Sequence, residues 1–267
     1  MSACVHLTAI LGAAMSPVAD AIVVLASVFG SGLLGLSLRS VLPERHLRED
    51  SLGMVRLCTG VIATLAALVL GLLVASAKAN YDRVNDEITQ AAAAIVLLDR
   101  TLGQFGPQTQ EARNLLRTAV ASVANTVFSD HGRGVAALDD PQRLAVGDRL
   151  QAEIRKLTAE NDVQRSLQAR ALDLSNEVAK IRLLTISQAQ GSIPVVFLIV
   201  LVLWLAIMFA GFGLVTSKNP TVIITLFLCA LSLAGAVFMI EELNRPLEGL
   251  MKVSSTPIRY ALSHLGV

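Results

Sequence analysis

The chain has 267 residues, of which 54% are hydrophobic and 16% are charged. This composition is too apolar for an ordinary soluble domain of that length. Its 22 basic and 21 acidic side chains give a formal net charge of +1, so there is no broad positive field of the kind that binds nucleic acid. The composition therefore indicates a membrane protein and argues against a nucleic-acid-binding one.

Four long stretches carry no charged residue, and they form two pairs, residues 21–38 with 57–77 and residues 183–217 with 219–240. A bilayer core requires about 20 apolar residues as a helix, with every backbone group bonded inside the segment. Most of the charged residues lie between the pairs. The sequence thus predicts an all-α, polytopic membrane protein with four transmembrane helices and a helical extramembrane domain inserted between spans 2 and 3.

The predicted boundaries follow from the same pattern. They comprise an N-terminal segment with transmembrane helices 1 and 2 (1–77), the helical extramembrane domain (78–190), transmembrane helices 3 and 4 (191–241) and a C-terminal tail (242–267).

The first span is predicted over residues 18–38 and contains Gly30, Gly32 and Gly35, which formally match the dinucleotide-binding pattern G-x-G-x-x-G. That pattern binds a pyrophosphate only as a turn between a strand and a helix. Here it lies inside a helix of membrane length, so we interpret the match as accidental. Glycines in a membrane helix allow a neighbouring backbone to approach closely, and we expect close packing here.

The second span, predicted over residues 54–77, has small residues at every fourth position. This small-residue stripe consists of Ala63, Ala67, Gly71 and Ala75. Small residues promote van der Waals packing between helices in lipid. The stripe packs either within one subunit or around an oligomer axis, where the span would line a narrow apolar constriction. The candidates for pore-lining residues are Ile62, Leu65, Val69 and Leu72.

An amphipathic continuation follows the second span without an intervening proline. Its apolar residues recur three and four positions apart, at Tyr81, Val84, Ile88, Ala91, Ile95, Leu98 and Leu102. Residues with that spacing form a seam for another helix. One helix from residue 54 to 102 would be about 73 Å long at 1.5 Å per residue. Such a rod is typical of a channel stalk and equally of a signalling coiled coil.

Three more helices are predicted in the extramembrane domain, beginning at Pro107, after a cap at Asp140, and near Asp162. A loop over residues 129–134 precedes the second of them. Their expected core faces are Ala112, Leu116, Ala119, Val123 and Val127; Leu144, Leu150, Ile154 and Leu157; and Val163, Leu167, Ala171, Leu174, Val178 and Ile181. The third span is predicted from about Pro194, and the fourth over residues 222–240.

Motifs for catalysis and metal binding are missing from the sequence. There is no H-E-x-x-H, G-x-S-x-G or Walker pattern and no Cys/His cluster. The cysteines and histidines are scattered and are interpreted as buried apolar and solvated side chains respectively: Cys4, Cys58 and Cys229, and His6, His46, His131 and His264. No charge lies near the middle of a span, which disfavours proton-coupled transport. We therefore predict no catalytic residue, no metal, no cofactor and no enzymatic activity.

Two segments resemble the bestrophin-like family of bacterial and plant membrane proteins. One is the exit of the second span, residues 78–83, followed by an alanine-rich helix at 90–94. The other follows the fourth span and has the pattern acid-Leu-Asn-Arg-Pro-x-x-Gly, with a Ser-x-x-Pro stop at 254–257. The matching motif residues are Glu242, Asn244, Arg245, Pro246 and Gly249. Lys78 and the apolar N-terminus depart from the family pattern.

The resemblance implies an architecture and a function. Bestrophins proper are pentameric anion channels with a helical cytosolic domain and an apolar neck lined by their second span. The implied partners are the lipid bilayer, inorganic ions and identical copies of the chain, five in number. Glu242 and Arg245 would act as a structural clamp between tail and domain. The acids near the fourth span, Glu241, Glu242 and Glu248, do not supply the six to eight oxygens that calcium requires.

Two functional hypotheses remain open. The first is an oligomeric ion channel or pore in which the second helix lines an apolar gate that closes by dewetting. The alternative is a membrane-anchored scaffold or sensor whose helical domain binds protein partners through its seam. The basic residues near the spans favour a cytoplasmic helical domain, and we expect a multi-pass protein of the bacterial inner membrane.

Overall fold

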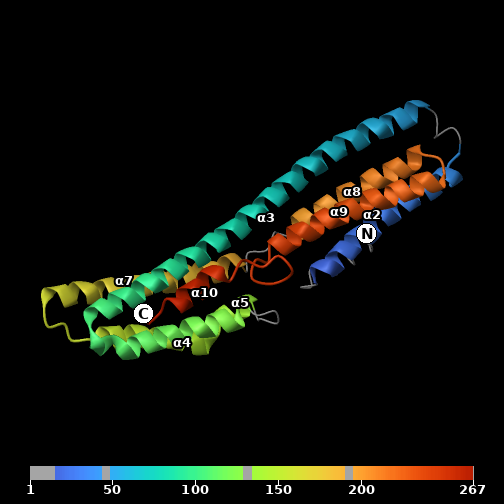
Figure 1. Cartoon of the computed structure of the whole chain (residues 1–267). Coiled ribbons are helices and arrows are strands. Elements are labelled where there is room, and N and C mark those ends of the chain that lie inside the picture. The colour runs from blue at the N-terminus through green and yellow to red at the C-terminus, as the bar shows by residue number, and fades with distance from the viewer. Residues whose placement is uncertain (1–15, 44–48, 129–133, 190–194, 267) are drawn as a thin grey trace. The chain divides into compact units, whose positions relative to one another are not determined.

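A computed structural model describes residues 16–43, 49–128, 134–189 and 195–266 of the chain (Figure 1). All regular structure in these ranges is helical. The helices are α2 (Pro17–Val41), α3 (Glu49–Phe105), the 3-10 turn η2 (Pro107–Thr109), α4 (Gln110–Thr126), α5 (Gly134–Leu138), α6 (Pro141–Lys156), α7 (Asp162–Ala189), α8 (Val195–Val215), α9 (Pro220–Leu243) and α10 (Thr256–Ser263).

The helices form two compact units, Met1–Lys78 with Ser192–Asn244 and Ala79–Gly191 with Arg245–Val267. The first unit holds α2, the first half of α3, α8 and α9; the second holds the remaining helices. In the part of the chain that the structure describes, four helices are long and apolar enough to cross a membrane: α2, α3, α8 and α9. The predicted all-α class with four spans is confirmed.

Local capping explains several helix ends. Asp140 accepts a hydrogen bond from the backbone N–H of Gln142 at the start of α6, as predicted. Asn219 caps α9 in the same way, through the N–H of Thr221. Each cap precedes a proline at the first helical position, where the missing N–H costs nothing. The helix α3 has 57 residues and is longer than predicted at both ends.

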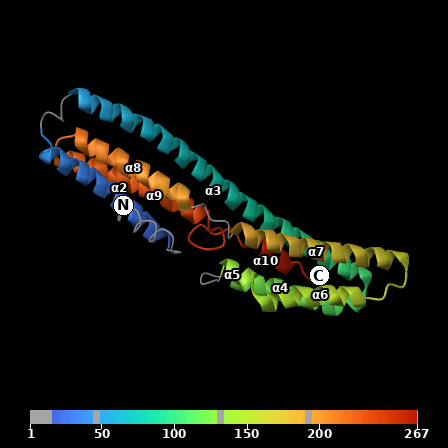
Figure 2. The same ribbon diagram turned by 180° about the vertical axis from the view of Figure 1, so that it is seen from behind.

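In the first unit, α2 packs along α8 and α9, and the three helices lie side by side in both views (Figures 1 and 2). The ring of Phe29 on α2 meets that of Phe227 on α9 edge to face, with centroids 5.4 Å apart. Apart from Glu242 at the end of α9, the buried side chains on the three helices are apolar: Val24, Val28, Leu36, Leu198, Leu201, Val202, Leu205, Phe209, Leu226, Ala230, Ala234, Val237, Ile240 and Leu243.

The contact between α2 and α8 depends on glycines at the crossing. A Cβ on Gly35 would overlap the carbonyl oxygen of Ala210, and a Cβ on Gly213 would overlap that of Gly32. The two backbones therefore touch directly, which gives the van der Waals contact that holds helices together in lipid. Gly32 and Gly35 are thus packing residues, as expected from the sequence, whereas a Cβ on Gly30 would meet nothing within 4 Å.

At one end of this helix pair, a basic side chain joins the two helices. Arg39, in the last turn of α2, donates from Nη1 to the carbonyl oxygens of Leu214 and Val215 at the C-terminus of α8. The final carbonyls of a helix have no partner within the helix and carry its negative dipole end. Arg39 donates hydrogen bonds to these carbonyls and places a positive charge at the negative dipole end, and it thereby links the ends of two spans.

We expect Gly35→Ala to destabilise the first unit by about 1–3 kcal/mol, because the added methyl group separates two backbones in contact. Thermal unfolding in detergent, followed by loss of monodisperse protein, measures the change. The matched control is Gly30→Ala on the same helix, where a Cβ would meet nothing within 4 Å. Equal melting temperatures for the two variants would contradict the glycine contact.

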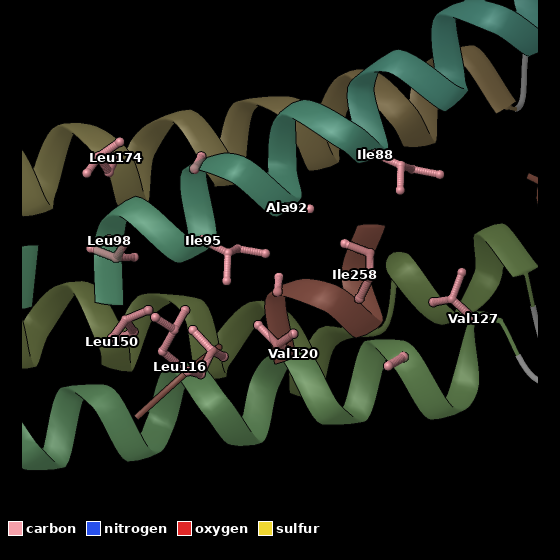
Figure 3. Close-up of a cluster of buried hydrophobic side chains, with 14 of the residues drawn as sticks. Ile88, Ala92, Ile95, Leu98, Leu116, Val120, Val127, Leu150, Leu174 and Ile258 are labelled. Atoms are coloured by element: carbon pink, nitrogen blue, oxygen red, sulfur yellow. The ribbon is translucent and has the colours of Figure 1, made fainter. Parts of the chain in front are cut away.

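The second unit has one apolar core, shown in part in Figure 3. Side chains from α3, α4, α6 and α7 converge in it, together with Ile258 of α10. The predicted seam of α3 is part of this core: Val84, Ile88, Ile95, Leu98 and Leu102 are buried. The seam therefore packs against helices of its own chain.

Several positions on the other predicted core faces differ from expectation. On α4, Ala112 and Leu116 are buried as predicted and Val120 and Ala124 are buried as well, whereas Ala119 and Val123 are only half-buried. Leu144 on α6 and Val163 on α7 are exposed. Val163 lies in the first turn of α7.

A buried ion pair ties α3 to α4 and to the tail. Asp99 is 2% exposed and accepts hydrogen bonds from Nε and Nη2 of Arg113, at 2.8 and 2.9 Å, and from the backbone N–H of Gly266, at 3.1 Å. Burial by itself raises the pKa of Asp99, but these hydrogen bonds and the charge of Arg113 hold that pKa below its ordinary value.

We expect Asp99→Asn to lower the free energy of unfolding by about 3–5 kcal/mol, because it leaves the charge of Arg113 without its buried partner. In the unchanged protein, ionised Asp99 stabilises the fold above the unfolded carboxyl pKa, near about 4. That contribution is lost as the pH falls through the lower folded-state value.

Denaturant unfolding between neutral and acid pH measures both effects. Asp162→Asn is the control, because the Asp162–Arg165 pair is exposed and should contribute less than about 1 kcal/mol. If both variants unfold alike, Asp99 does not carry the stabilisation assigned to it.

Candidate functional site

The first half of α3 is buried along a single narrow face. Thr59, Ala66, Leu73 and Ala77 are its buried residues, and they recur at seven- and four-residue intervals. A Cβ on Gly211 of α8 would lie 2.6 Å from Oγ1 of Thr59, so this face meets α8 at Thr59. The rest of the span is covered only in part by its own chain.

The four pore-lining candidates lie on one flank of the buried face. Successive residues point about 100° apart around a helix, which turns Leu65 to one side of Ala66. Leu65 and Leu72 are 44% and 63% exposed. Ile62 and Val69 are half-buried, closer to the face that packs on the chain itself.

The small-residue stripe lies on the opposite flank. Ala67, Gly71 and Ala75 are exposed, and Ala63 is half-buried. A Cβ on Gly71 would meet nothing within 4 Å, and the same holds for Gly53 and Gly60 on this side of the helix. Within this chain, the stripe is therefore not the contact surface of α3.

A continuous exposed ridge was missed in the sequence. It consists of Met54, Leu57, Val61, Leu65, Leu68 and Leu72, all exposed large apolar residues. We call these six residues the α3 ridge. Their spacing of three and four places them on one helix face. Periodicity alone could not separate the ridge from the buried face, because apolar residues surround the whole span.

The motif after the fourth span forms a turn that packs within the second unit. Glu248 N–H donates to the carbonyl of Arg245 at 3.0 Å, and Val253 N–H donates to that of Pro246 at 2.8 Å. Gly249 has φ +77°, a value that side-chain-bearing residues rarely adopt. Leu247, between the motif residues, is buried in the core.

The other motif residues end α9 in the first unit. Asn244 is its C-terminal cap, and its N–H donates to the carbonyl of Ile240 at 3.1 Å. Glu242 is buried at the same end. The clamp between Glu242 and Arg245 stays a prediction.

The residues that the structure describes contain no group of three or more His, Cys, Asp or Glu side chains placed to hold a metal ion.

Cys58 and Cys229 are exposed on membrane-length helices, so the prediction that they are buried is wrong for a single chain. His264 lies at the end of α10, with its Nδ1 2.8 Å from the carbonyl oxygen of Tyr260. Cys4, His6, His46 and His131 lie outside the described residues.

Together these features define a class: an integral membrane protein with four helical spans, an all-helical second unit, and a second span whose apolar and small faces are open. The Bestrophin-like domain model matches residues 24–258. The chain belongs to the Bestrophin-like family, as the motif after the fourth span had indicated.

Solved structures of bacterial relatives have the same fold. A bacterial bestrophin homologue from Klebsiella pneumoniae, carrying an isoleucine-to-threonine substitution, matches with a TM-score of 0.62 and 14% sequence identity, over 91% of this chain and 97% of that one. A second variant, with leucine replaced by threonine, gives the same TM-score and identity over 89% and 97%. A search of curated proteins found no match.

Proposed function

We propose that the chain forms an oligomeric ion channel in which the α3 ridge faces the central axis. The observation that carries this proposal is that α3 leaves two different faces open on the same span: a large apolar ridge and a small-residue stripe. A helix that faced only lipid would not require the small-residue stripe.

The small-residue stripe is assigned to a neighbouring subunit. A glycine in a helix costs roughly 1 kcal/mol relative to alanine, and α3 has exposed glycines at positions 60 and 71 with open space around them. A helix of a second copy that packs there offsets this cost by close van der Waals contact. With one flank on a neighbour and the buried face on α8, the ridge is directed to the axis.

At the axis, rings of Leu65 and Leu72 from several copies form an apolar constriction. Such a constriction blocks ions by dewetting and conducts when it widens. Of the four pore-lining candidates from the sequence, we place Ile62 and Val69 at the edge of the pore-facing surface of α3, because they are half-buried in one chain. Five copies are proposed from the resemblance to bestrophins proper.

The rival hypothesis, a scaffold that binds partners through its heptad seam, is less well supported. The seam residues Val84, Leu98 and Leu102 are buried within the core of their own domain, so they are not available to a partner helix. This observation favours the channel.

We also propose that the helical domain lies on the cytoplasmic side of a bacterial inner membrane, from the basic residues near the spans. A cysteine introduced at exposed position 165, tested with a membrane-impermeant thiol reagent in sealed vesicles, determines its side.

Replacing the leucines that form the constriction with a smaller residue should increase ion flux. We expect Leu65→Ala and Leu72→Ala, in protein reconstituted into liposomes, to conduct severalfold more than the unchanged chain, because smaller rings are more easily wetted. Flux under chloride and potassium gradients measures this effect.

The matched control is Ile224→Ala on α9, which removes an equally exposed apolar side chain from a span not proposed to face the axis. The channel is contradicted if no variant conducts any ion, and the assignment of the ridge is contradicted if all three variants conduct alike.

The small-residue stripe gives a separate test of assembly. We expect Gly71→Leu to convert most of the oligomer to smaller species, because the new side chain keeps the neighbouring helix away. Native mass spectrometry in detergent counts the subunits. Gly235→Leu on α9 is the control, since that glycine is also exposed with nothing within 4 Å of its Cβ. An unchanged oligomer in Gly71→Leu would place the interface elsewhere.

A further inference from the structure

The second unit contains a cavity of about 570 Å³ beside its core. Residues of α3, α4, α6 and α7 line it, together with Leu247 and Ile258 of the C-terminal segment. All of these residues belong to the same unit. The volume lies within the range of about 300–1,000 Å³ that is typical of pockets for small organic ligands.

Part of the cavity wall consists of apolar residues that the sequence had predicted to lie in the core. Ala119, Val123, Leu144 and Val178 occupy positions that helical periodicity assigns to the interior, yet they are half-buried or exposed and line the cavity. They keep the apolar character of core residues without the neighbours that core residues have. An apolar body inside the cavity would supply those neighbours.

A glycine keeps one wall open. Gly147 lies inside α6 and lines the cavity, and a Cβ there would meet nothing within 4 Å. Packing in this chain therefore gives no reason for glycine, although glycine in a helix interior is unfavourable. A larger side chain at this position would occupy the cavity.

Two arginines, Arg143 and Arg182, are among the polar residues that line the cavity, which also include Asp140 and Asp148. Arg182 donates from Nε and Nη2 to the carbonyl oxygen of Leu138, and Arg143 donates from Nε to Oγ of Ser122 at 3.3 Å. Burial and the nearby charge of Arg143 lower the pKa of Arg182, while Asp139 and Asp140 act in the opposite direction.

The charge of Arg182 is compensated only in part. Asp140 is engaged as the cap of α6, and among the described residues no carboxylate forms a salt bridge with Arg182. A half-buried guanidinium bonded to a neutral carbonyl retains donor capacity for an anion, since the group carries five N–H donors.

We propose that this cavity binds a small organic anion with an apolar body, such as a medium-chain carboxylate. Its apolar chain lies against Ala119, Val123, Gly147 and Val178, and its carboxylate meets Arg182, with Arg143 beside it. The proposal does not depend on ion conduction, because the site is contained in the helical unit.

The experiment uses the full-length chain in lipid nanodiscs and a decanoate analogue with a photoreactive diazirine on its chain. After illumination, mass spectrometry of peptides locates the crosslinks. We expect labelling of α4 and α6, competition by decanoate, and competition at least about tenfold weaker by decanol, which lacks the charge.

Two variants separate the parts of the proposal. Gly147→Leu fills the cavity and should abolish labelling of α4 and α6, whereas Gly147→Ala adds only one methyl group and should retain it. Arg182→Gln should weaken competition by decanoate about tenfold and leave competition by decanol unchanged. Circular dichroism and subunit number confirm that each variant is folded.

Three results overturn the proposal. Crosslinks confined to the membrane spans or equally present in Gly147→Leu show that the cavity is not the site. Equal competition by decanoate and decanol shows that the arginines do not select an anion. Protection of the cavity by a second copy, seen as labelling that appears only when the oligomer is dissociated, shows that a subunit is the occupant.

Discussion

Helices in a bilayer gain little by hiding apolar side chains from lipid, so they associate where their backbones approach most closely. In the first unit that approach is made by α2 and α8, with Gly35 against Ala210 and Gly213 against Gly32. In the same unit, α3 is buried only along one narrow face, at Thr59, Ala66 and Leu73, where Thr59 meets Gly211 of α8. The two flanks of α3 on either side of this face stay open, and the proposed axis and subunit interface both depend on them.

The spans and their class could be predicted because lipid imposes a simple rule: charge-free runs of sufficient length must be helical. The long amphipathic part of α3 was also predictable, since Val84, Ile88, Leu98 and Leu102 follow a strict period and are buried. Which face of a span meets which neighbour was not predictable. Leu65 and Ile62 are equally apolar, and only the structure, in which Thr59 meets Gly211 of α8, shows that the first is exposed while the second is half-buried. The motif after the fourth span indicated the family because its glycine and proline serve a particular turn, whose geometry few other residues adopt.

In the helical unit, two buried carboxylates are stabilised by side chains from other helices. Asp99 takes hydrogen bonds from Arg113 and from the backbone of Gly266, a residue far away in sequence. Glu87 is likewise buried and accepts from Thr185 and Gln188 of α7. Such pairings could not be found in the sequence, because each partner looks like one of many surface residues. Arg182 differs from Asp99 and Glu87 in that its main partner is a neutral carbonyl, and it lines the cavity.

The core of the helical unit includes Leu247, Val253, Ile258, Ala261 and Leu265, all of which follow the fourth span in the chain. During synthesis, the helices of this unit emerge from the ribosome well before those residues exist. Until α9 has been made and the chain has continued past it, the apolar faces of α3 and α4 lack the side chains that cover them. Completion of the extramembrane fold therefore comes after synthesis of the last span, and a fragment cut from between the second and third spans would expose the part of its core that the C-terminal segment covers.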